Sequence, residues 1–253
     1  MQNLWKIILV GSILLNLVAI WGFFHFIRYG GSPLGELKRR LTGTTKQTGP
    51  SIPYAEENER IKKRLEAGET DSTRVVFFGA SITARWDLER DFPRVSILNR
   101  GVGGQLVPQM LARFKRDVVD LRPRAVVIKF CSINIRPQLP LAVLKDGMEM
   151  MTQLARANDI TPVVSTIIPA GKPEAHIGDF SAADSLRAFN TWVRQYAEVN
   201  SLYLIDFAAA IEDDDGFLPR DCSTDPVHVN ERGYTILAAA ARPVIYRAAG
   251  LSP

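Results

Sequence analysis

Residues 74–86 read RVVFFGASITARW, a short apolar and β-branched run that is followed at once by a loop with glycine and serine. Four further apolar runs follow along the chain, at residues 95–98, 125–130, 162–168 and 202–207. Their near-continuous apolarity is typical of strands that are covered on both faces, as the strands of a parallel sheet are. We therefore predict five strands at these positions.

Amphipathic helical patterns separate the apolar runs. Apolar residues recur at helical spacing within residues 106–121, 144–154, 186–196 and 231–247, and Asn230 is a suitable N-cap for the last of these helices. Five strands that alternate with helices predict a three-layer α/β/α fold with a five-stranded parallel sheet. Ligands bind such sheets at the carboxyl ends of the strands, so the loops at those ends form the candidate site.

The N-terminal segment has a different character. Residues 4–27 read LWKIILVGSILLNLVAIWGFFHFI, in which Lys6 is the only formally charged residue. About 20 apolar residues that rise roughly 1.5 Å each can cross a ~30 Å hydrocarbon core. We predict one uncleaved N-terminal transmembrane helix within residues 1–29. The alternative is a cleaved secretory signal, which normally has a shorter apolar region and an A-x-A-like site that is not evident here.

Residues 30–56 mix glycine and proline with threonines and charges, a composition that predicts a flexible linker ahead of a folded domain at residues 57–253. The basic residues that follow the apolar segment, Arg28 and residues 38–40, favour a cytoplasmic domain by the positive-inside rule. A signal-anchor interpretation instead places the domain outside. Our prediction is a single-pass membrane protein with its folded domain on the extracytoplasmic side.

Composition excludes several classes of function. The chain has 253 residues, a net charge of +4 and a pI of about 9.1, which is too mildly basic to indicate nucleic-acid binding without a concentrated basic patch. Two cysteines exclude a disulfide-stapled scaffold and a four-thiolate zinc site, and we expect buried free thiols at Cys131 and Cys222. We predict no nucleic-acid partner, no metal and no organic cofactor.

Four loops beside the predicted strands and helices carry candidate functional residues. Ser81 follows the first strand, Gly104 lies in the loop after the second, and Asn134 lies in the loop after the third. Asp225 and His228 precede the last helix, where His228 is the natural base for a serine hydroxyl and Asp225 can hold the imidazole tautomer. Each signal is weak alone, because a helix N-cap, a flexible turn or a capped loop explains the same residues.

Together, and in this order, the four loops resemble the sequence blocks of the SGNH hydrolase superfamily, also called GDSL lipases and esterases. GASITARW at residues 79–86 is similar to its first block, NRGVGG at residues 99–104 to its second, and DPVHVNERGY at residues 225–234 to its last. SIN at residues 132–134 is a poorer match to the third block. The resemblance covers about residues 73–247.

The resemblance implies a flavodoxin-like SGNH hydrolase fold in which the domain at residues 57–253 is catalytic. It implies that Ser81 is the nucleophile and that His228 and Asp225 complete a triad. It further implies an oxyanion hole made by the backbone N–H groups of Ser81 and Gly104 and the side-chain amide of Asn134.

Three residues depart from the family's pattern. Ala80 replaces the aspartate of the first block, and Ser132 and Ile135 replace the glycine and the aspartate of the third block. The third block aims the amide of Asn134, so a catalytically inactive descendant is one alternative.

These features predict a membrane-tethered serine esterase that hydrolyses an acyl ester, such as an O-acetyl group, of a cell-envelope glycan or lipid. An acyltransferase would use the same acyl-enzyme, with a sugar hydroxyl in place of water. A glycan- or lipid-binding relic and a flavodoxin-like nucleotide binder would share the fold, but nucleotide binding leaves Asp225 and His228 unexplained. Arg85 and Arg136 could meet an anionic substrate, and solvation at the surface is the default explanation of both.

Overall fold

The fold comes from a computed structural model, which describes residues 52–252 apart from residues 137–138, 173–175 and 178–179. The predicted transmembrane helix at residues 1–29 and the predicted linker up to residue 51 lie outside the described residues. In the described part of the chain, no helix is both long enough and apolar enough to span a bilayer.

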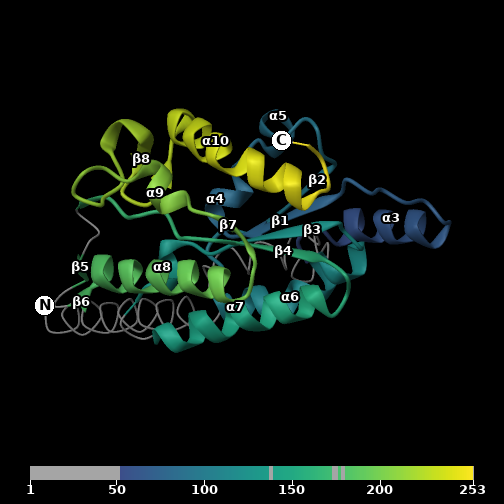
Figure 1. The fold of residues 1–253 in the computed structure, drawn as a ribbon, viewed down its shortest axis with the longest axis horizontal. Coiled ribbons are helices and arrows are strands. Elements are labelled where there is room, and N and C mark those ends of the chain that lie inside the picture. The colour runs from purple at the N-terminus through teal and green to yellow at the C-terminus, as the bar shows by residue number, and fades with distance from the viewer. Residues whose placement is uncertain (1–51, 137–138, 173–175, 178–179, 253) are drawn as a thin grey trace, which may run out of the picture. The chain divides into compact units, whose positions relative to one another are not determined.

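Five parallel strands form the central sheet, in the order β2-β1-β3-β4-β7 (Figure 1). The strands are β1 (Val75–Gly79), β2 (Ile97–Gly101), β3 (Ala125–Lys129), β4 (Thr161–Ser165) and β7 (Tyr203–Ile205). The predicted five-stranded parallel sheet is confirmed. β4 ends three residues before its apolar run does, because the Ile167 N–H is bound at 2.8 Å by the Asn190 Oδ1 atom and not by a neighbouring strand.

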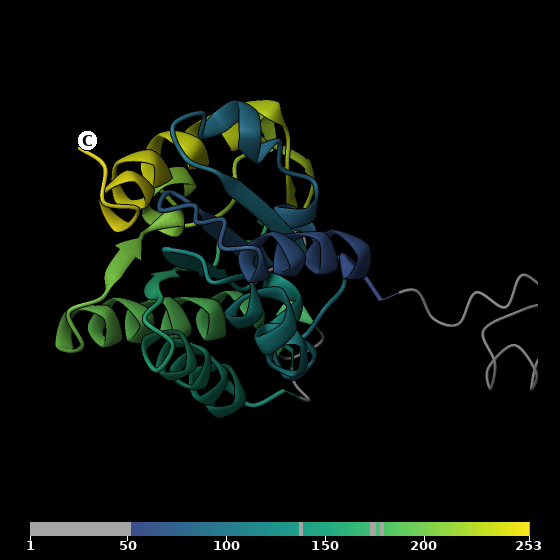
Figure 2. The same ribbon diagram turned by 90° about the vertical axis from the view of Figure 1, so that its right-hand side faces the viewer.

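Helices cover both faces of the sheet (Figure 1 and Figure 2). One face carries α6 (Val107–Asp117), α7 (Leu141–Arg156) and α8 (Ala182–Val199), and the other carries α10 (Glu231–Ala248) with the short helices α4 (Ser81–Ala84), α5 (Leu88–Asp91) and α9 (Phe207–Ile211). Side chains of β1 alternate between two cores: Val75 and Phe77 lie on the α10 side, and Val76 and Phe78 lie on the α6 side. Burial on both faces explains why the strands read as continuous apolar runs.

The remaining described elements are one helix, three 3₁₀ turns and two hairpins. They are helix α3 (Ala55–Glu66), the 3₁₀ turns η1 (Val119–Leu121), η2 (Ser132–Asn134) and η4 (Arg220–Cys222), and the hairpins β5–β6 (His176–Ile177, Phe180–Ser181) and β8–β9 (Ser223–Asp225, His228–Val229). Because α3 begins at Ala55, the last two residues of the predicted linker are helical. Asn230 caps α10 as predicted, with its Oδ1 atom accepting the Gly233 N–H at 3.0 Å. Cys131 and Cys222 are buried free thiols.

Polar side chains join α3 to the sheet and to α6. The Tyr54 hydroxyl donates a hydrogen bond to the Gly101 carbonyl at the end of β2. Asn58 donates from Nδ2 to Asp117 Oδ1 at 2.7 Å and accepts on Oδ1 from Arg100 Nε at 3.0 Å. The first described helix is therefore fixed to the strand that leads into the second candidate loop.

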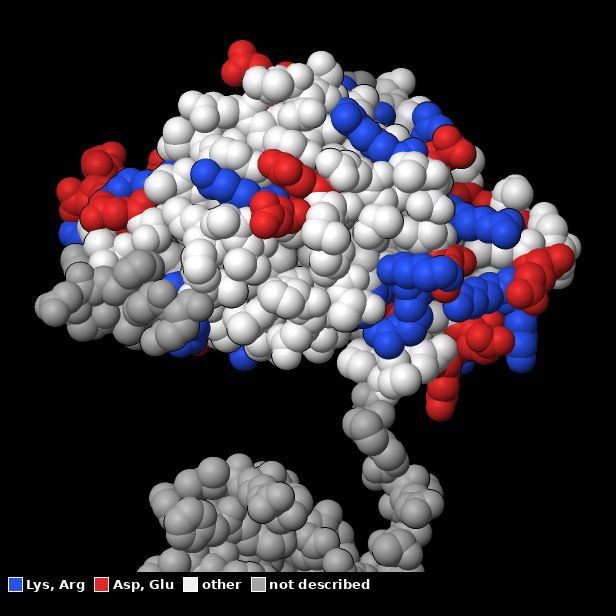
Figure 3. Space-filling model, turned by 90° about the horizontal axis from the view of Figure 1, so that it is seen from below, with Lys and Arg blue, Asp and Glu red and all other residues white. Residues whose placement is uncertain are grey.

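The side of the molecule below α7 carries charges of both signs. Lys and Arg side chains lie beside Asp and Glu in mixed groups on the right of Figure 3, and the middle of this face is largely uncharged. The face therefore shows alternating charges and not a concentrated basic patch.

The strand order also indicates where ligands bind. Within the sheet, β2 lies on one side of β1 and β3 lies on the other, so the chain reverses its direction of travel across the sheet after β2. Open α/β sheets bind ligands at the carboxyl ends of the strands where the order reverses in this way. Ser81 follows β1 and Asn134 follows β3, so both lie at this position.

Candidate active site

Ser81 is the first residue of α4, two positions beyond the end of β1. The turn between them is too tight for a side chain at Gly79, because a Cβ atom there would lie 2.2 Å from Thr83 Oγ1 and 2.9 Å from the Lys129 carbonyl oxygen. The N-cap position of α4 belongs to Ala80, so Ser81 does not have the capping role that its position also suggested. Its half-buried side chain lines a cavity.

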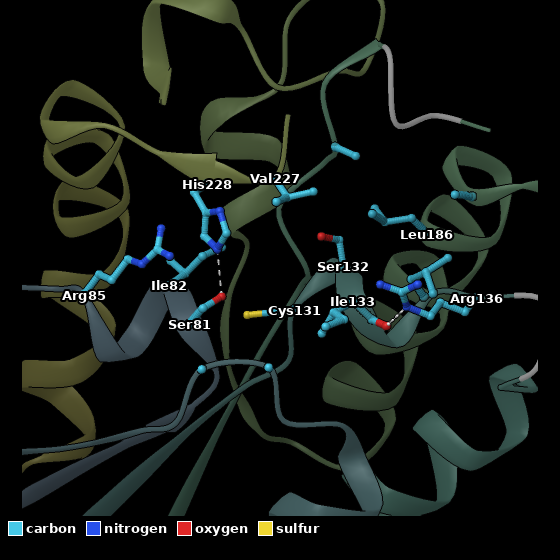
Figure 4. Close-up of a pocket in the computed structure, with 15 residues that line it drawn as sticks. Ser81, Ile82, Arg85, Cys131, Ser132, Ile133, Arg136, Leu186, Val227 and His228 are labelled. Atoms are coloured by element: carbon cyan, nitrogen blue, oxygen red, sulfur yellow. Dashed lines mark hydrogen bonds between the residues drawn. The ribbon is translucent and has the colours of Figure 1, made fainter. Parts of the chain in front are cut away.

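His228 lies opposite Ser81 across the edge of this cavity (Figure 4). Its Nε2 atom is 3.0 Å from Ser81 Oγ, although the two residues are 147 positions apart in the sequence. The β8–β9 hairpin makes this approach possible, because β9 begins at His228. The nucleophile and the base that the sequence predicted are therefore within hydrogen-bonding distance.

Asp225 lies behind the imidazole and is paired with His228 across the same hairpin. His228 Nδ1 is 2.8 Å from Asp225 Oδ2 and 3.0 Å from Oδ1. The backbone N–H groups of Val227 and His228 each donate to Asp225 Oδ1 at 2.9 Å. Burial alone would raise the pKa of Asp225, but these N–H groups and the imidazole outweigh it and lower that pKa below its ordinary value.

The ionised carboxylate decides which imidazole nitrogen carries the proton. A carboxylate only accepts hydrogen bonds, so Nδ1 of His228 must donate to Asp225. In the neutral ring Nε2 is then the acceptor, and it faces the Ser81 hydroxyl. This is the tautomer that a general base needs in order to take a proton from serine.

Two backbone N–H groups border the cavity next to Ser81. Ser81 and Gly104 both line it, and within the described residues neither N–H group has a hydrogen-bond acceptor. Gly104 adopts a φ of +75°, a left-handed conformation that glycine tolerates and that turns the following backbone. Both groups are therefore available to a substrate oxygen.

Asn134 lies in η2 after β3, but its side chain is fully buried and does not line the cavity. Its Oδ1 atom accepts the Val107 N–H at 2.8 Å, and its Nδ2 atom donates to the Cys131 carbonyl at 3.2 Å. The bond from Val107 fixes which end of the amide is the oxygen. Nδ2 carries two hydrogens, so one remains beyond the bond to Cys131.

Hydrogen bonds also tie the candidate loops to one another. Asn99 donates from Nδ2 to the Thr83 carbonyl at 2.8 Å and accepts the Gly101 N–H at 2.9 Å. Tyr234 in α10 donates its hydroxyl to the Ile82 carbonyl at 2.8 Å. Burial raises the pKa of Tyr234 to about 12, so its hydroxyl stays a donor over the whole neutral range. The last sequence block is therefore anchored on the turn that presents Ser81.

A buried arginine that the sequence did not indicate also binds the strand ends that lead into these loops. Arg113 in α6 donates from Nη2 to the carbonyls of Gly79 and Arg100, each at 2.9 Å, and from Nε to the side chain of Gln105. Its Nη1 atom is 2.9 Å from Asp117 Oδ2. The i, i+4 spacing of Arg113 and Asp117 was the one signal of this pair in the sequence.

The cavity has a volume of about 390 Å³, within the range of small-molecule sites. Its walls away from Ser81 are mainly apolar and come from η2, the segment after β4 and α8. They include Ile133, Ile135, Ala170, Ala182 and Leu186. Arg85 and Arg136 also line the cavity. The arrangement can therefore hold a small ester with its carbonyl carbon at Ser81.

The sequence profile of the GDSL-like lipase/acylhydrolase family matches residues 77–236, a span that contains all four candidate loops. The chain belongs to this family. The predicted membership of the GDSL or SGNH hydrolases is therefore confirmed, and with it the general class of ester hydrolases.

Two solved structures and one curated protein are similar to this GDSL-like hydrolase. A GDSL-like lipase from Bacteroides thetaiotaomicron VPI-5482 is 25% identical with a TM-score of 0.67, over 77% of this chain and 96% of that one. A candidate acylhydrolase from Bacteroides fragilis NCTC 9343 is 26% identical with a TM-score of 0.70, over 81% and 99%. The uncharacterized lipoprotein YqeF of Bacillus subtilis (strain 168) is 28% identical over 118 residues, 38% of this chain and 48% of the relative. The match spans about half the length of that curated relative.

Proposed function

We propose that this GDSL-like hydrolase is a serine esterase that removes an acyl group, such as acetyl, through an acyl-enzyme on Ser81. The observation that carries the proposal is the 3.0 Å approach of His228 Nε2 to Ser81 Oγ, with Asp225 bound to the opposite ring nitrogen. A serine hydroxyl is a weak nucleophile, and a base in this position activates it.

In the first half of the proposed reaction, His228 takes the proton from the Ser81 hydroxyl as Oγ bonds to the acyl carbon. Asp225 stabilises the imidazolium, and the carbonyl oxygen becomes an oxyanion. The free N–H groups of Ser81 and Gly104 would donate hydrogen bonds to this oxyanion. His228 then gives its proton to the departing alcohol oxygen as the ester bond breaks.

In the second half, water attacks the acyl-enzyme. His228 takes a proton from the water, and the proton returns to Ser81 Oγ when the carboxylic acid leaves. No step requires a group other than these side chains, the backbone N–H groups and water. The cycle restores the hydrogen bond between Ser81 and His228.

Asn134 is proposed as the third oxyanion donor, through the Nδ2 hydrogen that Cys131 does not bind. We expect Asn134→Ala to lower kcat by about 10²–10³-fold, the usual effect of losing one such donor. The variant also leaves the buried Val107 N–H without its acceptor, which should cost about 1–3 kcal/mol of folding stability. Kinetics on the folded fraction, with thermal unfolding measured alongside, separate the two effects. A kcat close to that of the wild type would make Asn134 a purely structural residue.

The proposal extends to the class of substrate and to the side of the membrane on which the catalytic domain lies. The apolar segment at residues 4–27 supports a membrane tether, and the similar B. subtilis protein is described as a lipoprotein. We propose that the catalytic domain lies on the extracytoplasmic side and acts on an acyl ester of an envelope glycan or lipid.

One labelling experiment tests the reaction and the location together. Intact cells that produce the full chain are treated with a fluorophosphonate probe that does not cross membranes. We expect a labelled protein that sediments with the membrane fraction, and a modified peptide that contains Ser81. Ser81→Ala should abolish labelling. Ser132→Ala is the matched control and should still be labelled, since Ser132 lines the same cavity but the hydroxyl at hydrogen-bonding distance from His228 Nε2 is that of Ser81.

The possible failures are distinguishable. If the folded, purified protein is not labelled, the serine esterase is wrong. If the purified protein is labelled but intact cells are not, only the extracytoplasmic location is wrong. If the labelled protein remains in the soluble fraction, only the membrane tether is wrong.

A further inference from the structure

Apart from His228, the charged side chains among the described residues that line the active-site cavity are arginines. Arg85 and Arg136 both line it, and no described residue that lines it is an aspartate or glutamate. Asp225 lies behind His228, and its carboxylate is bound by three N–H groups, those of the Val227 and His228 backbone and of the His228 ring. A ligand in this cavity therefore meets apolar walls and two guanidinium groups.

Arg136 is held in place on the cavity side. Its Nε atom donates to the Ile133 carbonyl at 3.0 Å, and the Leu139 N–H closes a turn on the Arg136 carbonyl at 3.1 Å. In Figure 4 its side chain lies on the side of the cavity away from Ser81, below Leu186 and to the right of Ser132. Among the described residues, no hydrogen bond occupies either Nη atom of Arg136.

Arg136 also lacks an acidic partner among the described residues, although it is exposed. Arg113, Arg116 and Arg194 are each paired with an aspartate at 2.9 Å or less. An arginine that is fixed by one hydrogen bond and faces a cavity without a carboxylate is suited to bind an anion, because its planar donors match carboxylate and phosphate oxygens.

We propose that the ester which this enzyme hydrolyses carries an anionic group, a carboxylate or a phosphate, and that Arg136 binds it and determines this specificity. The inference rests on the proposed esterase function and names its substrate class. The apolar walls formed by Ile133 and Leu186 hold the uncharged part between the ester and the anion. Arg85 lies on the opposite side of the Ser81–His228 pair and has no described hydrogen bond that fixes it (Figure 4).

Two matched pairs of chromogenic esters test the proposal. 4-Nitrophenyl hydrogen glutarate and 4-nitrophenyl valerate differ in whether the acyl chain ends in a carboxylate or a methyl group. 3-Carboxy-4-nitrophenyl acetate and 4-nitrophenyl acetate differ in a carboxylate on the alcohol side. The pairs therefore show which half of the substrate carries the anion. Rates are measured at low ionic strength, where exposed charges are least screened, and the uncatalysed rate is subtracted.

We expect the wild type to prefer the anionic member of at least one pair. Arg136→Gln should lower kcat/KM for that ester by about tenfold, chiefly through KM, with little change for its neutral partner. Arg136→Lys should retain part of the preference, because it keeps the charge but not the planar donors. Arg247→Gln is the matched control: Arg247 is also exposed, is also held by one backbone carbonyl, at 3.2 Å, and lies on α10 outside the cavity.

Equal effects of Arg136→Gln on the charged and neutral members of both pairs would overturn the proposal while the esterase function stands. If no ester is hydrolysed, the esterase function fails and the anion site is tested by binding alone. Calorimetric titration with glutarate and with 3-carboxy-4-nitrophenol, the charged products, should then show binding that Arg136→Gln loses and Arg247→Gln keeps. Binding that does not differ between these two variants would overturn the anion site.

Discussion

Replacing His228 by alanine should lower kcat for an aryl ester by about 10⁴-fold or more while the protein stays folded. The variant removes the group that is 3.0 Å from Ser81 Oγ, and no other described histidine, aspartate or glutamate lines the cavity to replace it. The Ser81 hydroxyl would then keep its proton during attack. Steady-state kinetics on purified protein measure the loss, and thermal unfolding checks that the β8–β9 hairpin is intact.

The double variant makes this prediction sharper. In the proposed mechanism Ser81 and His228 act as one unit, so Ser81→Ala combined with His228→Ala should be no slower than the slower single variant. Thr224→Ala is a control in the same hairpin, because Thr224 is exposed and its described side-chain hydrogen bond, to the His228 carbonyl, is a long one of 3.4 Å. Its kcat should change by no more than about twofold. Losses that multiply in the double variant would show that the two side chains act independently, against the proposed mechanism.

The second large effect concerns stability. Asp117→Ala should lower the free energy of unfolding by about 3–5 kcal/mol, because it leaves a buried arginine without its counter-charge. Asp117 is fully buried and binds Arg113 at 2.9 Å, Arg116 at 2.8 Å and Asn58 at 2.7 Å. Urea unfolding at neutral pH measures the loss.

A nearby aspartate provides the control for Asp117. Asp120 in η1 also binds two cations, Lys62 and Lys115, but its side chain is 20% exposed. Exposed ion pairs contribute about 0–1 kcal/mol, so Asp120→Ala should have a small effect. If both variants lose the same small amount, the buried network does not carry the stability that we assign to it.

The effect of Asp117 also depends on pH, and its sign follows from the pKa. Burial alone would raise the pKa of Asp117, but hydrogen bonds and charges from Arg116 and Arg113 outweigh it and lower that pKa. The carboxylate therefore stabilises the fold at any pH above its unfolded-state value of about 3.9. This stabilisation is lost as the pH falls toward the lower folded-state pKa, so the difference between wild type and Asp117→Ala should shrink below about pH 4.

The sequence predicted the sheet most clearly where a strand is buried on both faces, as β1 and β3 are, whereas Tyr203 in the edge strand β7 is exposed. Val75 through Phe78 leave no polar side chain on either side of β1, so the apolar run itself marks the strand. Ser81, Asp225 and His228 were predictable because each lies at the end of a short helix or strand, and few other residues could serve the same chemistry. The structure brings these three together and places Gly104 on the same cavity wall.

The sequence could not predict what depends on contacts between distant elements. Arg113 lies in an amphipathic helix, where an arginine normally faces solvent, and its burial depends on carbonyls that come from β1 and β2. The orientation of the Asn134 amide depends on a backbone N–H in α6. Leu186 reaches the cavity only because α8 lies beside η2 and the segment after β4.

The contacts of helix α3 determine where the chain can be truncated from its N-terminal side without loss of buried partners in the folded domain. The family match begins at residue 77, after α3 has ended. Tyr54, however, donates a hydrogen bond to the Gly101 carbonyl, and Asn58 binds both the Arg100 guanidinium and the Asp117 carboxylate. A fragment trimmed to the shared family span would uncover that buried arginine and take one ligand from that aspartate. Truncation for crystallisation or assay therefore has its natural cut point ahead of Tyr54, at the boundary near residue 52.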